Sequence, residues 1–174
     1  MDNRVVQLLG VASLAAVDRL RAAVATGEVE AGALVHIQAW PGGSVGDLAG
    51  VVGLSQPATV RLVDRLVDQE LVRREPGRDR RTVALVLTEA GARAADAVLA
   101  ARAQALAPLL ADLSPEERAT LERLLGRVVA GVAEDRRGAV RACRLCDREA
   151  CTADPGCPLE RTTRPGDARP ARGR

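Results

Sequence analysis

Apolar residues recur every three or four positions at the start of the chain, which is the spacing of an amphipathic helix. They predict a first helix over residues 4–25, through Val5, Leu8, Leu9, Ala12, Ala16 and Leu20. A loop around Gly27 and Gly32 is expected next, and then a second helix over residues 34–40, which Pro41-Gly42-Gly43 would stop. No neighbouring sequence covers the apolar stripe of the first helix, so it must pack on a remote segment or on another chain.

The next stretch has the pattern of two helices joined by a tight turn. Ser44, followed three residues later by Asp47, is a start signal for a helix that Gly53 ends. Ser55 is the expected cap of a second helix over residues 56–69. This order of helix, turn with glycine and helix predicts a helix-turn-helix.

The second of these helices has two different faces. At 100° per residue, the apolar face holds Val60, Val63 and Val67, with Thr59 and Leu66 beside them. The opposite face carries Pro57, Ala58, Arg61, Asp64 and Arg65. Such a helix fits the major groove of DNA, where Arg61 is expected to contact a guanine edge and Arg65 a base edge or a phosphate. The alternative is that both arginines only solvate a surface helix and pair with Asp64 and Asp68.

The N-terminal end of this helix carries a partial positive charge, which suits phosphate groups. Ser55 and Gln56 lie at that end and are expected to contact the DNA backbone. The expected DNA contacts of the helix are Ser55, Gln56, Pro57, Thr59, Arg61 and Arg65.

Two strand-like runs follow, over residues 71–75 and 82–87, and they flank a turn rich in arginine. From Arg73 to Arg81 there are five arginines and two acidic residues, so this segment alone is net basic by +3. A hairpin with arginine at its tip, directly after a helix of this kind, is the pattern of a winged helix-turn-helix. The tip arginines can enter the narrow, negative minor groove.

Several pieces of residues 44–91 stand together in order: the helix L-S-x-P-x-x-x-R-L-V-D-R-L, the strand L-V-R-R, the turn D-x-R and the helix start L-T-x-x-G. Together they resemble the MarR (multiple antibiotic resistance regulator) family of bacterial transcription factors. Over residues 1–137, the resemblance implies a mainly α fold with a small β-hairpin wing, a winged helix-turn-helix whose long N- and C-terminal helices form a homodimer interface. It also implies binding to a palindromic operator in double-stranded DNA, commonly as a repressor that a small-molecule effector or oxidation releases.

The resemblance also assigns roles within the wing. In the family the D-x-R pair steadies the wing, and this role falls here on Asp79 and Arg81. Arg78 and Arg80 would form the exposed tip, so that the expected wing contacts to DNA are Arg78, Arg80 and Arg81. One position departs from the family pattern, because Glu70 stands where the recognition helix often ends in glycine. A non-glycine residue in a left-handed cap costs about 1 kcal/mol, so this helix end is expected to differ slightly.

Two further helices are expected after the wing. Thr88 is the predicted cap of a helix through Ala94, Val98 and Leu106, and Ser114-Pro115-Glu116-Glu117 is a start signal for the next. That last helix is apolar enough to need a partner, through Leu121, Leu124, Leu125, Val128, Val129 and Val132. With the uncovered first helix it favours a homodimer, and the alternative is packing within one subunit.

All four cysteines lie close together, as Cys143-x2-Cys146-x4-Cys151-x5-Cys157. In a cytosolic DNA-binding protein such a cluster favours a metal over disulfides. The favoured interpretation is a structural zinc ion held by four thiolates. An iron–sulfur cluster and a metal-free thiol switch that senses oxidation are the alternatives. Residues 138–160 are therefore expected to form a metal-binding extension, which has too few apolar residues to fold without its metal.

Composition adds limits to this interpretation. All 25 basic residues are arginine, and the net charge of +2 is too small to indicate DNA binding by itself. No apolar run approaches the roughly 20 residues of a membrane span, and the N-terminus lacks the pattern of a secretory signal, so we expect a cytoplasmic protein with no membrane partner. The last segment, residues 161–174, holds five arginines and one aspartate and is expected to be a disordered basic tail.

Other functions compete with DNA binding. A winged helix can instead bind an acidic protein partner through its arginines. An enzyme built on the cysteines is not expected, because the sequence has no nucleotide-binding glycine motif and no catalytic histidine or serine constellation near them. His36 is expected to be a packed or surface residue, and Trp40 a core residue that can also line an effector cavity.

Overall fold

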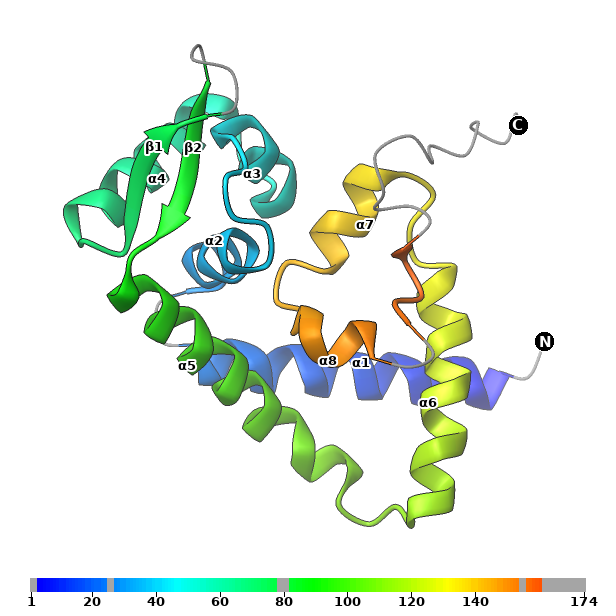
Figure 1. Ribbon diagram of the computed structural model, residues 1–174. Helices are drawn as coiled ribbons and strands as arrows, with labels where there is room; N and C mark the ends of the chain where they lie inside the picture. Colours follow the sequence, from blue (N-terminus) through cyan, green and yellow to red (C-terminus); the bar gives the residue numbers. More distant parts are fainter. Residues whose placement is uncertain (1–2, 25–26, 78–81, 154–155, 161–174) are drawn as a thin grey trace.

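The computed structural model describes residues 3–24, 27–77, 82–153 and 156–160 (Figure 1). The described part is mainly helical with one two-stranded hairpin, as the sequence predicts. In chain order the elements are α1 (Asn3–Ala23), α2 (Glu28–Ala39), α3 (Val45–Val52), α4 (Gln56–Asp68), β1 (Val72–Pro76), β2 (Val83–Leu87), α5 (Glu89–Leu106), the 3-10 turn η1 (Ala107–Leu110), α6 (Pro115–Ala130), α7 (Arg136–Ala142) and α8 (Arg148–Thr152).

Three of the four predicted side-chain caps are formed, at Ser44, Thr88 and Ser114, whereas the Ser55 side chain makes no capping hydrogen bond. The Ser44 hydroxyl accepts a hydrogen bond from the Asp47 N–H, and the Asp47 carboxylate accepts one from the Ser44 N–H at 3.0 Å, which is a capping box. Ser114 and Glu117 form the same box at the start of α6. The Thr88 hydroxyl accepts from the Gly91 N–H at 3.0 Å. These local interactions fix the helix starts before any tertiary contact is considered.

One expected loop is wrong. Gly32 lies inside α2, which begins directly after Gly27, and Gly27 has a φ of 83°. Arg144 packs over Gly32, with the Arg144 Cβ 3.6 Å from the position that a Cβ of Gly32 would take. No local sequence pattern indicates this contact, because it joins residues more than a hundred positions apart.

The main core lies inside the winged head, which we define as residues 28–95. Buried residues of α2, α3, α4, both strands and α5 meet there, namely Ala33, Leu34, Ile37, Leu48, Val52, Leu62, Val63, Leu66, Val72, Leu85 and Ala95. In the hairpin, Arg74 of β1 stands opposite Leu85 of β2. Gly42 and Gly43 also pair with β2, since the Gly42 N–H donates to the Leu85 carbonyl at 2.9 Å and the Leu85 N–H to the Gly43 carbonyl at 3.0 Å. The segment that stops α2 therefore also ties it to the wing.

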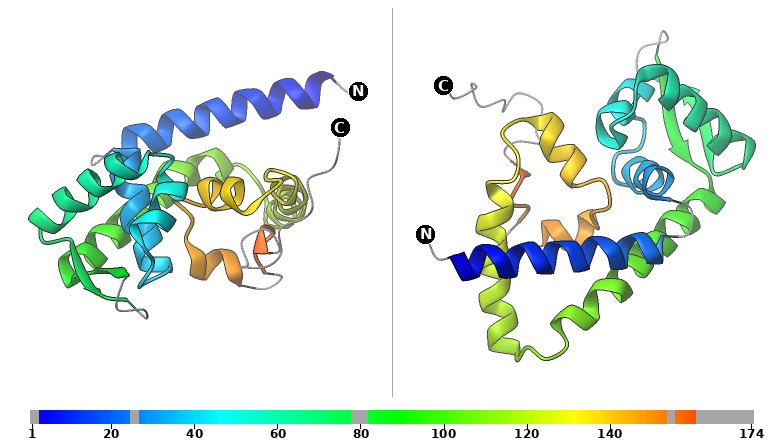
Figure 2. Two further views of the ribbon diagram at one scale, coloured as in Figure 1. Left: turned by 90° about the horizontal axis from the view of Figure 1, so that it is seen from above. Right: turned by 180° about the vertical axis from the view of Figure 1, so that it is seen from behind.

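Among the described helices, α1, α6, the five-residue α8 and the 3-10 turn η1 contain no buried residue. α1 packs along α5, and α6 turns back from the far end of α5 (Figure 1). α1 and α6 cross in Figure 1, but the view from above in Figure 2 shows the N-terminal part of α1 apart from α6. Apolar side chains on both helices stay exposed, among them Leu8, Val11, Leu14, Leu124 and Val128. Both faces thus remain uncovered within one chain.

The C-terminal segment returns to the head. α7 packs against α3, and the boundary expected between residues 137 and 138 falls inside α7. The expected basic tail, residues 161–174, lies outside the described residues. No single described helix is both long and apolar enough to cross a membrane. The two segments Glu89–Leu110 and Pro115–Ala130, bent by 116° relative to each other, would together be long and apolar enough, by length and composition alone.

The end of α4 does not differ from a glycine cap in the way expected at Glu70. Glu70 has a φ of 58° and is the one non-glycine residue with positive φ in the described part of the chain. Its N–H donates to the Val67 carbonyl at 2.9 Å, and the Leu71 N–H donates to the Leu66 carbonyl at 2.9 Å. This pair of bonds is a Schellman motif, in which glycine is the usual residue at the left-handed position. The helix keeps the geometry of a glycine cap at the cost of strain in Glu70.

We therefore expect Glu70→Gly to raise the free energy of unfolding by about 0.5–1 kcal/mol, because glycine adopts positive φ without a Cβ penalty. Urea unfolding followed by circular dichroism measures the change. The control is Gln69→Gly next to it, where φ is −83° and glycine relieves nothing; this variant should be less stable than the parent chain. A loss of stability in Glu70→Gly equal to that of the control would contradict the strained cap.

Candidate nucleic-acid interface

The inward face of α4 differs from the predicted one by part of a turn. Its buried residues are Thr59, Leu62, Val63 and Leu66, at the spacing i, i+3, i+4 and i+7. Val60, which the sequence placed inside, is 38% exposed, and Leu62, which it did not, is buried. The composition of the helix fits two apolar stripes, and only the position of the surrounding core selects between them.

Thr59 is a wrong assignment among the expected DNA contacts. Its side chain has no exposed surface, and its hydroxyl donates to the Ser55 carbonyl at 2.9 Å. A threonine can enter a core in this way because the carbonyl four residues earlier satisfies its hydroxyl. The buried side chain cannot reach a base or a phosphate.

The other expected contacts of α4 lie on the surface. Ser55, Gln56, Pro57, Arg61 and Arg65 are all exposed. Ser55 occupies the N-cap position, but its side chain makes no capping hydrogen bond. These side chains are therefore available to a ligand at the N-terminal end and along the outer face of the helix.

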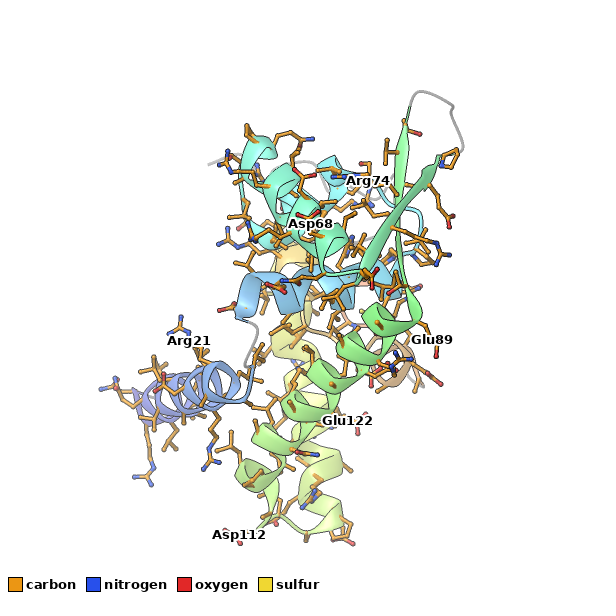
Figure 3. The ribbon with its side chains drawn as sticks, turned by 90° about the vertical axis from the view of Figure 1, so that its left-hand side faces the viewer. Arg21, Asp68, Arg74, Glu89, Asp112 and Glu122 are labelled. Carbon is orange, nitrogen blue, oxygen red and sulfur yellow. The ribbon has the colours of Figure 1, made fainter. Side chains whose placement is uncertain are left out.

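The acidic residues of α4 do not neutralise its arginines. Asp64 pairs with Arg74 of β1 at 2.6 Å, and Figure 3 shows Arg74 between the hairpin and α4. Among the described residues, neither Arg61 nor Arg65 forms a salt bridge; the Arg65 guanidinium only donates to the Arg61 carbonyl at 3.4 Å. The pairing with Asp64 and Asp68 that would make both arginines ordinary surface residues is not formed. The Arg74–Asp64 pair instead joins the wing to α4.

The base of the wing is ordered by its own bonds. Arg73 pairs with Glu75 at 2.6 Å and also donates to the Leu87 carbonyl at 3.2 Å, and the Gly77 N–H donates to the Thr82 carbonyl at 2.9 Å. The four residues assigned to the tip, Arg78, Asp79, Arg80 and Arg81, lie outside the described residues.

A cavity of about 660 Å³ lies between the head and the C-terminal segment. Its walls come from α2, α5 and the start of α8, and include Gln38, which donates to Asp96 at 2.6 Å. Trp40 is half-buried but does not line this cavity. Its ring lies 4.9 Å from that of His36 and 5.2 Å below the Arg148 guanidinium. Burial lowers the pKa of His36 below its ordinary value.

The four cysteines are half-buried and all are free thiols. The side chains of consecutive cysteines interact, Cys143 with Cys146, Cys146 with Cys151, and Cys151 with Cys157. The interaction between the Cys143 and Cys146 side chains lowers the pKa of Cys143 and raises the pKa of Cys146. In the part of the chain that the structure describes, no three histidine, cysteine, aspartate or glutamate side chains already surround a common point as metal ligands do.

An arginine-bearing helix held by a preceding helix and braced by a hairpin defines a winged helix-turn-helix, the architecture of a large class of DNA-binding proteins. The MarR family model matches residues 28–83, which run from the start of α2 to the start of β2. The resemblance seen in the sequence is confirmed, because the winged helix-turn-helix of this chain matches the MarR family model and solved structures of MarR family regulators. Members of this family are transcription regulators and not enzymes.

Solved structures agree with this assignment. A MarR family protein from Bacillus stearothermophilus is 29% identical with a TM-score of 0.64, covering 74% of this chain and 95% of its own. RV1404 from Mycobacterium tuberculosis is 26% identical with a TM-score of 0.65, covering 75% and 94%. The apo form of wild-type MarR from E. coli is 26% identical with a TM-score of 0.58, covering 70% and 94%. No curated protein matches the chain in sequence.

The role of Thr59 can be tested by comparing Thr59→Ala with Ser55→Ala. Thr59→Ala removes buried volume and a satisfied hydroxyl, so we expect the free energy of unfolding to fall by about 1–2 kcal/mol, with the DNA affinity of the folded protein unchanged within about twofold. Ser55→Ala should cost less than about 0.5 kcal/mol, because that side chain caps nothing. An unchanged stability together with weakened DNA binding in Thr59→Ala would restore Thr59 as a contact residue.

Proposed function

We propose that this protein is a sequence-specific transcription repressor that binds a palindromic operator in double-stranded DNA as a homodimer. The observation that carries the proposal is the outer face of α4, on which Arg61 and Arg65 are exposed and free of salt bridges among the described residues. The opposite face is anchored by four buried side chains, so the guanidinium groups are held at a fixed orientation.

In this proposal α4 lies in the major groove. Arg61 makes a bidentate contact to a guanine, and Arg65 contacts a base edge or a phosphate. Ser55, Gln56 and Pro57 stand at the N-terminal end of α4, where the backbone N–H groups and the free Ser55 hydroxyl suit a phosphate. The wing, with Arg78, Arg80 and Arg81 in its sequence, follows into the minor groove.

The homodimer is supported by the uncovered helices α1 and α6, which we call the arms. α1 and α6 bury no residue within one chain, although each carries a row of large apolar side chains. Contiguous exposed apolar surface of this kind marks an interface in a folded protein. A second copy placed against these two helices would cover both rows and would present a second α4, which is the arrangement that a palindromic operator requires.

The cavity beside α2 and α5 supports control by a small molecule. Its volume lies in the range of ligand pockets, and its lining mixes apolar groups with the Gln38–Asp96 pair and with Arg148 and Glu149. A ligand there would contact both the head and the long helix that leads to α6, and could change the angle between them. A repressor must reach the chromosome, so the proposal includes a cytoplasmic location.

Arg61→Ala should weaken binding to a preferred DNA duplex by about 1–3 kcal/mol and relax the preference at one base position, because it removes a base contact. The probe is a labelled duplex selected from a randomised library with the wild-type protein, and fluorescence anisotropy measures the affinity. The control is Arg93→Ala on α5, which removes an equally charged residue paired with Glu89 away from α4 and should leave affinity unchanged within about twofold.

The same titration separates DNA binding from the rival function. A regulator of this type should show a preferred sequence and an affinity that falls steeply with salt. If no selected duplex is preferred over random DNA, and an acidic peptide competes equally well, the winged helix serves as a protein-binding module and the proposal is wrong.

The dimer can be broken on α6. The double variant Leu124→Arg with Val128→Arg places two charges in the exposed apolar row, and we expect it to sediment as a monomer and to lose binding to the palindromic duplex by more than tenfold. The matched control is Glu122→Arg, a charge change on the opposite side of the same helix, which should remain a dimer. A wild-type chain that sediments as a monomer would refute the homodimer.

A further inference from the structure

The four cysteines mark the points at which the C-terminal segment returns to the winged head. We call residues 136–160 the extension; it contains α7, α8 and all four thiols. The first interval between cysteines holds Arg144 and Leu145. The Arg144 Nε donates to the Glu28 carboxylate at 2.8 Å, its second nitrogen also pairs with that carboxylate, and its stem covers Gly32 of α2. Leu145 packs on a second apolar cluster formed by Val24, Ala31, Val35 and Val98.

The other parts of the extension also hold the head. In α7, Ala139 is fully buried against α3, and the guanidinium of Arg141 lies against Gly53, the turn between α3 and α4. In the second interval, Arg148 lies over the ring of Trp40. After the last cysteine, Leu159 is buried. Each stretch adjoining a thiol thus contributes one contact that depends on the path of the backbone through the cysteines.

Little else fixes that path. α7 and α8 have seven and five residues, too few for helices that are stable alone. The contacts to the head are few and dispersed, and the Glu28–Arg144 pair is about one third exposed, so it adds little by itself. An ordered extension of this size needs a cross-link, and in small segments that is a disulfide or a metal. The four free thiols are the groups of the extension that could hold such a metal.

The chemistry and spacing of the thiols suit a soft metal ion, although among the described residues no three of them yet surround a common point. All four sulfurs belong to one continuous row of side-chain contacts, half-shielded from solvent. Their spacings of two and four residues lie within the range typical of zinc sites, and the third spacing, of five, is one longer. A zinc ion with four thiolates carries a net charge of about −2. The sequence places Arg141, Arg144 and Arg148 beside or between the cysteines, so positive charge accompanies the site.

We propose that Cys143, Cys146, Cys151 and Cys157 bind one zinc ion, and that this ion fastens the extension to α2, α3 and the turn before α4, so that DNA affinity depends on metal occupancy. Zinc draws the row of sulfurs around one point, and this shortens the free backbone between the contacts on the head. The extension leaves the arginine face of α4 open, because its contacts are to α2, α3, Gly53 and Trp40. Bound metal therefore pre-organises the reading head, and the metal-loaded form binds DNA more tightly.

Metal binding is tested first, without DNA. The full chain, purified without chelator, is measured for zinc and iron by elemental analysis, for visible absorbance, and for free thiols. We expect about one zinc per chain and no visible absorbance in the wild type. A variant with all four cysteines replaced by serine should contain no zinc. Limited trypsin digestion then measures how well the extension is protected from cleavage. Zinc should slow cleavage after Arg144 and Arg148 by at least tenfold in the wild type and not in the serine variant.

The effect on DNA is tested next, and this part alone rests on the proposed function. Removing zinc with a chelator should weaken binding to the selected duplex by at least about fivefold, and adding zinc back should restore it. Because the same wild-type chain is compared with itself, a serine variant that fails to fold does not weaken the test. The control is Arg144→Ala, which keeps all four thiols and loses the contact to Glu28; it should still bind one zinc, with a smaller difference between its loaded and metal-free affinities.

The outcomes separate the two proposals. Iron with visible absorbance, loss of the free thiols to disulfides, or no metal at all would each overturn the zinc site. One zinc with equal DNA affinity in both forms would overturn the coupling. A chain that binds zinc and protects its extension but binds no DNA would refute the proposed function and leave the zinc site standing.

Discussion

The structure depends on how α4 is seated in the winged head. Thr59, Leu62, Val63 and Leu66 enter the same core as Leu34, Leu48 and Leu85, so three helices and the hairpin determine the rotation of α4 about its axis. This burial turns Arg61 and Arg65 outward. The strained Schellman cap at Glu70 and the Arg74–Asp64 pair then fix where α4 ends relative to the wing. The exposed arginines thus owe their position to buried groups that never meet a ligand.

The rest of the chain is less complete by itself. The head has a continuous core, whereas α1 and α6 expose rows of leucine and valine along their length. A hydrophobic row of this length is stable in water only when something covers it. The long α5 connects these two parts, because it packs on α1 and on α2 and also lines the cavity beside α2.

The extension adds a third body to this layout. Its contacts reach Glu28 and Gly32 on α2, Gly53 at the turn before α4, and Trp40 at the end of α2. It therefore spans the junction between the head and the arms on the same side as the cavity, to which Cys146 and Thr152 contribute.

The sequence by itself determined the features that arise from neighbouring residues. The capping signals at Ser44, Thr88 and Ser114, the stop at Pro41 and the left-handed position of Glu70 depend on hydrogen bonds and backbone sterics within a few residues, so they could be predicted with no knowledge of the fold. The order of recognition motifs likewise identified the winged helix. Only the tertiary structure decided which of two adjacent apolar stripes of α4 faces inward, that Thr59 is buried, and that Arg144 reaches Glu28 and covers Gly32. These features depend on contacts between residues far apart in the chain, and a periodic pattern gives the presence of an apolar face but not the exact direction in which the core lies.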